Sequence, residues 1–185
     1  NKEYTIEQLN ASVKKVLQAK YWAGLSDYKP IKTVNIVEEL NTVENQVLHR
    51  KLIKNALTVV KNEGGLLPIK DLEQKKIAYV KLGDDNSDSF INMLQNYTKV
   101  DEVSDKNLDA LLRKLKKYDL VVLGYHTSNK NPWKDYRFTN KQLVWLQEIA
   151  REKQVILDVF ASPYSLLQLK SITNIEAILI SYQNS

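Results

Sequence analysis

Apolar residues recur at two different spacings along this chain, and the change of spacing divides it into two parts. Residues 5–23 carry an apolar side chain every three or four positions, which predicts an amphipathic helix with Thr5 as N-cap and Gln8 completing a capping box. Gly24 ends this helix, and the segment 26–33 shows no periodicity. A short helix is predicted at 35–40.

A long helix is predicted next, at 43–61, with a broad apolar stripe that we expect other elements to cover. The stretch NALTVVKNEGGLLPI at 55–69 contains its predicted end. Gly64 and Gly65 supply the left-handed conformations that a sharp exit needs, and Pro68 blocks further helix. We therefore expect a structural hinge, after which the leucines at 66–67 enter a core.

From Lys75 onward, short apolar runs alternate with amphipathic segments. Strands are predicted at 77–83, 120–127, 154–161 and 177–183, and helices at 87–97, 106–118, 140–153 and 162–169. The runs VVLG and VILDVF are almost continuously apolar, which is typical of parallel strands buried on both faces. The sequence predicts an α/β fold, layered α/β/α, with a mostly parallel sheet preceded by helices, and we expect the domain to be incomplete.

Composition narrows the classes of function. Hydrophobic residues make up 43% and charged residues 26%, as in an ordinary globular protein, and the absence of cysteine excludes disulfides and thiolate metal sites. The net charge of +5 is scattered, and its densest group, at 113–117, lies on a leucine-bearing helix, so we expect a solvated face and no nucleic-acid partner. No apolar run reaches the ~18 residues of a membrane span. The N-terminal segment lacks the features of a signal peptide, which leaves the compartment open.

The segment that follows the first predicted strand of the α/β part does not support a nucleotide-binding site. The segment 82–89 holds Gly83 as its only glycine, so neither a dinucleotide fingerprint nor a P-loop is present. A phospho-receiver domain is disfavoured, because the strand that should end in an acceptor aspartate offers Gly124 instead. We expect no cofactor.

Acidic residues in the same segment match part of a calcium loop. Asp84, Asn86 and Asp88 fit its first three ligand positions, but the sixth position is serine instead of glycine and the twelfth is glutamine instead of glutamate. Ser87 or Asp88 as the N-cap of the next helix explains the cluster better, and no metal ligand is assigned.

The second strand end is followed by the stretch GYHTSNKNPWKDYRFTN at 124–140, which has the strongest binding character in the chain. Its candidate residues are His126, Asn129, Asn131, Trp133, Asp135, Tyr136 and Arg137. Aromatic faces beside amides and charges suit a sugar, so we assign substrate binding to His126, Trp133, Asp135 and Arg137. The alternative is that Trp133 and Phe138 hold the loop against its own domain.

Three remaining candidates receive structural interpretations. His49 lies on the long predicted helix beside a basic residue and reads as a surface histidine. Asp158 falls inside an apolar strand, where an unpaired carboxylate is costly, so we expect a structural partner, with a cryptic site residue as the alternative. No G-x-S-x-G motif supports a serine triad, and no catalytic residue is assigned.

Three stretches, in order, resemble glycoside hydrolase family 3. NASVKKVLQAKYWAGL at 10–25 resembles the last helix of the family's (β/α)8 barrel. HRKLIKNALTVVKNEGGLLPI at 49–69 resembles the start of its second domain, keeping VVKN and LPI but placing Asn55 and Ala56 where the family commonly has glutamate and serine. VILDVFASPYSLLQL at 155–169 keeps the family's Ser-Pro-Tyr turn at 162–164, and AILISYQNS resembles the strand that follows.

The resemblance implies a division of the chain and a parent activity. Residues 1–42 would be the end of the catalytic barrel domain and a linker, and 43–185 an incomplete second, α/β-sandwich domain. Family members are retaining β-glycosidases with two carboxyl groups about 5–5.5 Å apart. In the family the nucleophilic aspartate lies on the barrel. The resemblance therefore assigns no catalytic residue to this chain.

The resemblance also implies partners and a location. The partners would be a β-linked sugar, bound by the parent enzyme, and the missing barrel. We favour an N-acetylglucosaminidase parent over a β-glucosidase, because no counterpart of the glucosidase branch's glutamate is found. The family suggests a bacterial, periplasmic or secreted enzyme. A carbohydrate-binding or structural scaffold module without a role in catalysis is the alternative.

Overall fold

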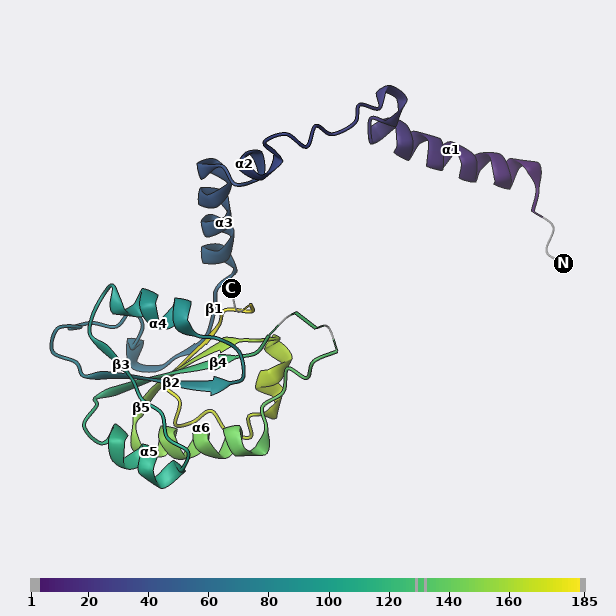
Figure 1. Ribbon diagram of the computed structural model, residues 1–185. Helices are drawn as coiled ribbons and strands as arrows, with labels where there is room; N and C mark the ends of the chain where they lie inside the picture. Colours follow the sequence, from purple (N-terminus) through teal and green to yellow (C-terminus); the bar gives the residue numbers. More distant parts are fainter. Residues whose placement is uncertain (1–3, 129, 132, 184–185) are drawn as a thin grey trace. The chain divides into compact units, whose positions relative to one another are not determined.

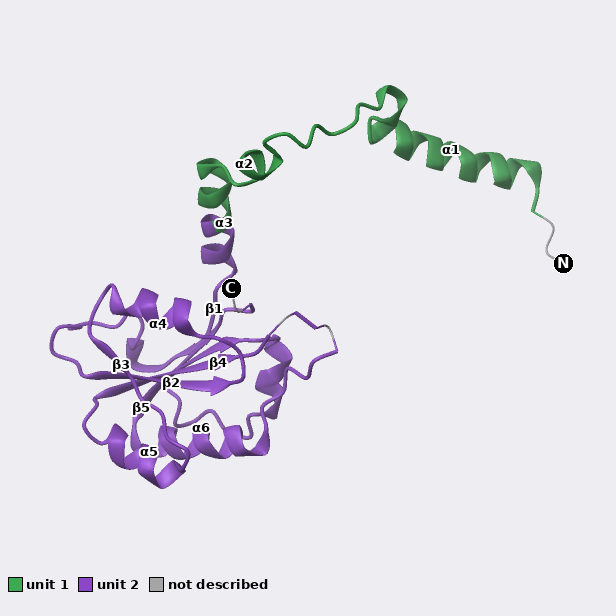
Figure 2. Cartoon of the chain, viewed as in Figure 1, with its two compact units in different colours: residues 1–49 green, residues 50–185 purple. Residues whose placement is uncertain are grey.

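The computed structural model describes residues 4–128, 130–131 and 133–183 (Figure 1). The chain divides into two compact units, residues 1–49 and 50–185, and the division falls inside helix α3 (Val43–Ala56) (Figure 2).

The first unit consists of helices. It contains α1 (Ile6–Trp22), the 3-10 turn η1 (Leu25–Asp27), α2 (Ile36–Leu40) and the start of α3. The predicted capping box is present, since Thr5 Oγ1 accepts from the Gln8 amide at 3.2 Å and Gln8 Oε1 accepts from the Thr5 amide at 3.1 Å. Gly24 follows α1 with φ +75°, as predicted. The apolar stripe of α1 is exposed along its length.

The second unit is built on a six-stranded sheet with the order β1-β6-β5-β4-β2-β3. Its strands are β1 (Thr58–Asn62), β2 (Ile77–Gly83), β3 (Val100–Glu102), β4 (Leu120–His126), β5 (Gln154–Phe160) and β6 (Ala177–Ile180). Its helices are α4 (Asp88–Gln95), α5 (Leu108–Leu115) and α6 (Asn140–Glu152), with 3-10 turns η2 (Glu63–Gly65) and η3 (Pro163–Gln168). Strands β2 to β6 are parallel and β1 is antiparallel to β6. The predicted α/β class is confirmed.

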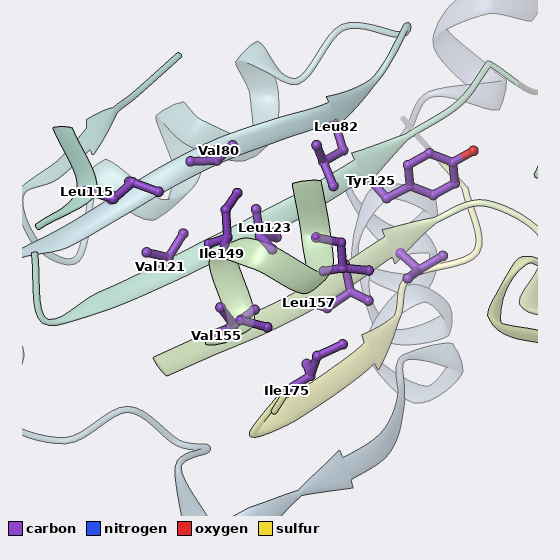
Figure 3. Packing of buried hydrophobic residues seen from close by; sticks show 14 of the residues in the cluster. Val80, Leu82, Leu115, Val121, Leu123, Tyr125, Ile149, Val155, Leu157 and Ile175 are labelled. Carbon is purple, nitrogen blue, oxygen red and sulfur yellow. The ribbon is translucent and has the colours of Figure 1, made fainter. Parts of the chain in front are cut away.

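Both faces of the sheet are covered, which gives the expected three layers. On one face, alternate strand residues such as Val121 and Leu123 pack with Leu115 of α5 and Ile149 of α6 (Figure 3). On the other face, a second cluster packs beneath α4 and the segment 66–72. Strand β4 is buried at all seven of its residues. This double burial explains its unbroken apolar sequence.

The strand order contains a reversal. From β2 the chain crosses outward through α4 to the edge strand β3, and then returns through α5 to β4 on the other side of β2. Such a reversal is a topological switch point, where the loops leaving two neighbouring strands diverge and ligands commonly bind. In this sheet it lies at the carboxyl ends of β2 and β4.

The predicted helix at 43–61 is wrong beyond Ala56. Helix α3 ends there, and Thr58–Asn62 forms β1, which pairs with β6 across a bulge between Val59 and Lys61. Thr58 and its two valine neighbours are β-branched and favour a strand once a partner strand is available. The apolar stripe expected to be covered is exposed, with Leu52 of α3 at 60% and Val59 of β1 at 55%.

The hinge prediction is otherwise confirmed. Gly64 and Gly65 have φ of +61° and +66°, and the following leucines pack against the second core cluster. Asn62 holds the turn closed, because its side chain accepts from the Leu67 amide at 2.9 Å and donates to the Leu67 carbonyl at 2.8 Å. The turn therefore leads out of an edge strand, not out of a helix.

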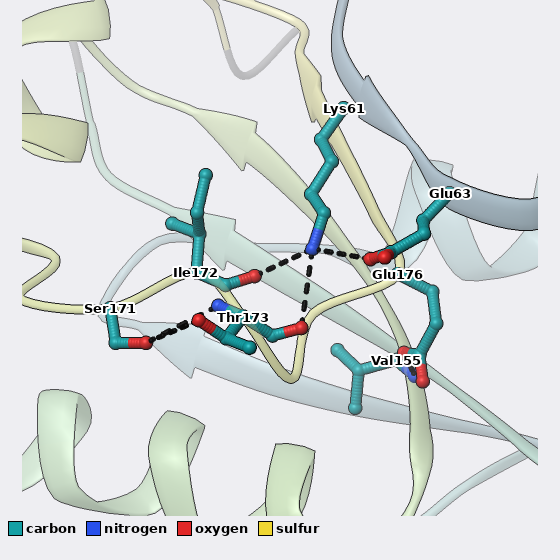
Figure 4. A network of polar contacts seen from close by, with 7 residues as sticks. All are labelled: Lys61, Glu63, Val155, Ser171, Ile172, Thr173 and Glu176. Carbon is teal, nitrogen blue, oxygen red and sulfur yellow. Dashed lines mark hydrogen bonds and ion pairs between the residues drawn. The ribbon is translucent and has the colours of Figure 1, made fainter.

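Lys61 fastens the edge strand to the rest of the sheet. Its ammonium group donates to the carbonyl oxygens of Ile172 at 2.8 Å and Thr173 at 3.3 Å, and pairs with Glu63 at 2.8 Å (Figure 4). These carbonyls belong to the segment that leads into β6. One side chain thus links β1 to the loop that positions its partner strand.

We expect Lys61→Met to destabilise the chain by about 1 to 2 kcal/mol, because two carbonyl groups lose a charged donor. Amide exchange should accelerate in β1. Urea unfolding of Lys61→Met is compared with Lys54→Met, which removes an exposed lysine of α3. Equal midpoints for the two variants would contradict this role.

Candidate functional site

The switch point brings the turn after β2 close to the loop after β4. Gly83, the last residue of β2, pairs with His126, the last residue of β4. The amides of Asp84 and Asp85 both donate to the His126 carbonyl oxygen, at 3.1 and 3.3 Å. A Cβ at Gly83, where φ is +91°, would lie 2.0 Å from that oxygen. Glycine is therefore required for this close approach.

His126, predicted to bind substrate, is fully buried. Its Nε2 is hydrogen-bonded to the Tyr79 hydroxyl at 2.8 Å, and its ring stacks on Phe160 with centroids 4.2 Å apart. The ring has no surface for a ligand to touch. A role in binding would therefore run through the loops that it supports.

The loop after β4, residues 127–139, carries the other predicted substrate residues; Asn129 and Pro132 lie outside the described residues. Trp133 is 91% exposed, and its amide donates to Asn131 Oδ1 at 2.9 Å. Asp135 and Arg137 are exposed and form a weak ion pair with 3.9 Å between Oδ1 and Nε. Asp135 and Arg137 thus pair with each other, and Trp133, two positions before Asp135 in the chain, is open to solvent.

Phe138, and not Trp133, holds this loop against the domain. The Phe138 ring stacks on Tyr125 with centroids 3.8 Å apart, and its amide donates to Gln168 Oε1 at 2.7 Å. The Tyr125 hydroxyl donates to the Tyr136 carbonyl at 3.2 Å. The end of the loop is fixed, whereas the Trp133 ring makes little contact.

One contact across the switch point was not predicted from the sequence. Lys134 Nζ lies 2.9 Å from both carboxylate oxygens of Asp84, so an ion pair joins the loop after β4 to the turn after β2. Opposite charges after two strands that neighbour each other in the sheet are the signal for such a pair. That signal needs the strand order, which the sequence analysis did not establish.

The acidic segment after β2 is organised by hydrogen bonds. Asn86 Oδ1 accepts from the Asp88 amide at 2.6 Å, and Asn86 Nδ2 donates to Asp88 Oδ2 at 2.9 Å. Ser87 occupies the N-cap of α4, as predicted, but its hydroxyl makes no capping bond. Among the described residues, no group of three or more acidic, histidine or cysteine side chains is arranged to hold a metal ion.

Asp158 has the structural partner that the sequence analysis expected. Ser181 Oγ, just after β6, donates to Asp158 Oδ1 at 2.7 Å. Burial raises the pKa of Asp158 from 3.8 to about 6, against the opposing effect of the Ser181 hydrogen bond. His49 is exposed on α3, also as expected.

No family model and no curated protein sequence matches this chain. Solved structures do match. A β-glucosidase from Listeria innocua matches with a TM-score of 0.68 and 20% identity, over 95% of this chain and 28% of its own. The β-glucoside phosphorylase BglX bound to 2FGlc matches with a TM-score of 0.66 and 17% identity, over 98% and 34%.

The sequence resemblance is therefore confirmed at the level of the fold. The chain spans about a third of the length of the enzymes it matches, so it corresponds to a part of them. No helix in the described ranges is long and apolar enough to cross a bilayer. The chain has the fold of a segment of β-glucosidase structures.

We expect Gly83→Ala to cost about 1 to 3 kcal/mol more than Gly65→Ala. Both glycines have positive φ, but a Cβ at Gly65 meets nothing within 4 Å, whereas at Gly83 it meets the His126 carbonyl. Because an alanine at either position is strained by the positive φ, the difference between the two variants reports the clash with the His126 carbonyl. Urea unfolding midpoints measure the difference, and equal losses would show that the close approach is not required.

We expect Asp158→Asn to stabilise the chain above pH 6. Because folding raises the pKa from 3.8 to about 6, the protonated carboxyl is favoured in the fold; its contribution is full below pH 3.8 and is lost as pH rises through 6. The amide mimics the protonated form, so the gain at pH 8 is on the order of 2–3 kcal/mol.

Urea unfolding at pH 5 and pH 8 tests this expectation, with Glu73→Gln as an exposed control. A pH dependence that is the same in Asp158→Asn and the unmodified chain would refute it.

Proposed function

We propose that this chain is the α/β domain, with adjoining helices, of a retaining β-glycosidase of glycoside hydrolase family 3. One observation carries the proposal: 95% of the chain superimposes on 28% of a β-glucosidase with a TM-score of 0.68. The three stretches that resemble the family support it, because they occur in the family's order along the chain.

In this proposal the domain is not catalytic and forms one wall of the sugar site. The loop 127–139 follows β4 at the switch point and presents Trp133 to solvent, and the same loop carries the exposed Asp135–Arg137 pair. An aromatic face stacks on the CH face of a sugar, and the charged pair can hydrogen-bond its hydroxyl groups. Asp135, Arg137 and Trp133 are the residues that would contact the sugar.

The partner in this proposal is a barrel domain. Residues 1–42 would form its end and a linker. The apolar stripe of α1 is exposed, with Leu9 at 57% and Leu17 at 58%, and an isolated amphipathic helix gains most of its stability by covering such a face. A barrel that buries this stripe supplies the missing cover.

The substrate class in this proposal is a β-linked sugar. Structures of the Listeria innocua β-glucosidase were solved with glucose and, for a mutant, with laminaribiose. The preference for an N-acetylglucosaminidase parent has one basis, which is that no counterpart of the glucosidase branch's glutamate is found in this chain. Glucose, laminaribiose and N-acetylglucosamine are therefore the three sugars to test.

A scaffold without a sugar contact is the second candidate. It is favoured by the internal pairing of the charged side chains, since Lys134 binds Asp84 and Asp135 binds Arg137. Groups that are already paired gain less from a ligand. The two candidates differ in whether Trp133 contributes to sugar binding.

We expect Trp133→Ala to weaken sugar binding about 3- to 10-fold, because one stacking face is lost. Each of the three sugars is titrated against the intact chain, and amide chemical shifts in the loop after β4 are followed. Trp22→Ala removes an equally exposed tryptophan from α1 and should leave affinity unchanged.

Affinity that is equal in the two tryptophan variants would contradict the wall and favour the scaffold. Hydrolysis of a nitrophenyl β-glycoside by the chain alone would contradict the non-catalytic role.

A further inference from the structure

The Tyr79 hydroxyl lies buried between the two loops of the switch point. It is hydrogen-bonded at 2.8 Å to Nε2 of His126, the last residue of β4, and the Ser87 side chain, in the turn after β2, lies close enough to influence its pKa. Tyr79 and His126 are fully buried and Ser87 is 4% exposed. A single phenol thus lies between the end of β4 and the turn after β2.

Burial keeps this phenol protonated. Loss of hydration raises the pKa of Tyr79 to about 12, with smaller contributions from nearby carboxylates, so the hydroxyl can both donate and accept near neutral pH. A buried hydroxyl that is hydrogen-bonded to a buried imidazole satisfies two polar groups that would otherwise be costly. The arrangement therefore resists separation of the loops.

Gly124 provides the space for this contact. A Cβ at that position would lie 2.5 Å from His126 Nε2 and 2.7 Å from the Tyr79 hydroxyl oxygen. Leu120 and Val122 pack in one core cluster, and Val121, Leu123 and Tyr125 in the other. Glycine at position 124 leaves room for the polar contact between Tyr79 and His126.

Backbone hydrogen bonds also connect the end of β4 to the turn after β2. The His126 carbonyl accepts from the amides of Asp84 and Asp85, and Lys134 reaches back to the Asp84 carboxylate. Fixing the His126 ring thus fixes a carbonyl that holds the turn after β2. The loop that carries Trp133 and the turn that carries Asp84 share three connections.

We propose that Tyr79 and His126 are positioning residues that couple the turn 84–87 to residues 133–139 of the loop after β4, so that these two segments form one recognition surface. The identity of the ligand, a β-linked sugar, rests on the proposed function. The coupling itself does not. A sugar that stacks on Trp133 then also orders the turn after β2.

Tyr79→Phe tests the coupling because it removes only the hydroxyl. We expect amide exchange to accelerate about fivefold at Asp84 and Asp85 and also in residues 133–137, which is the effect of losing one net hydrogen bond. Tyr118→Phe is the matched control: it removes a buried tyrosine's hydrogen bond to Asp101 at the opposite end of β4.

A merely structural role would not produce this pattern. If Tyr79 only filled the core, exchange would accelerate across the sheet and Tyr118→Phe would behave alike. Exchange that stays unchanged at Asp84 and Asp85 in Tyr79→Phe would overturn the proposal, as would a change confined to one of the two loops.

A second variant distinguishes loss of the coupling from a general loss of stability. Lys134→Met leaves the core intact and should accelerate exchange at Asp84 but not in β5, whereas Lys130→Met, an exposed lysine of the same loop, should not. Acceleration by both lysine variants, or by neither, would count against the coupling.

Titration with the three sugars distinguishes failure of the coupling from failure of the proposed function. Coupled exchange without any response to glucose, laminaribiose or N-acetylglucosamine would leave the coupling standing and refute the sugar wall. Sugar binding at Trp133 that leaves the Asp84 amide unperturbed would support the wall and overturn the coupling.

Discussion

Burial of the central strands on both faces is the constraint on which the rest of this domain depends. A parallel strand between two helical layers has no solvent-facing side, so every polar group in it must find a partner within the fold. In β4 the polar ring of His126 stands at the last position and is bonded to Tyr79. In β5 the carboxyl group of Asp158 is bonded to Ser181. Both polar exceptions lie toward the carboxyl ends of their strands, where the loops begin.

The same constraint explains what the sequence predicted well and what it did not. Unbroken apolar runs identify β4 and β5, because such runs are typical of strands buried on both faces. The edge strands carry no such signal: β3 has three residues, one of them buried, and β1 is exposed on both faces and continues an apolar helical pattern. Their existence depends on partners far away in the sequence. Without β3 the reversal of strand order could not be seen.

That missing reversal also limited the prediction of the site. The loop after β4 was identified from its aromatic and polar residues, but the turn after β2 was read only as a calcium loop or a helix cap. Their connection through Lys134 and Asp84 spans 50 positions and requires knowing that β2 and β4 are neighbours. His126 was assigned to substrate together with the aromatic and polar residues that follow it, whereas its ring is fully buried at the end of β4.

The exposed Trp133 lies in a loop that is held to the domain at both ends. The loop is fixed at its start, where the Thr127 amide donates to the Phe160 carbonyl, and at its end, where Phe138 stacks on Tyr125. A large apolar ring left in water is unfavourable, and a loop free to fold back would cover it. Both ends of the loop are held by these contacts, and the Trp133 side chain between them is 91% exposed. The contacts at Thr127 and Phe138 therefore fix where the loop leaves and rejoins the domain, while an aromatic side chain between them stays open to solvent.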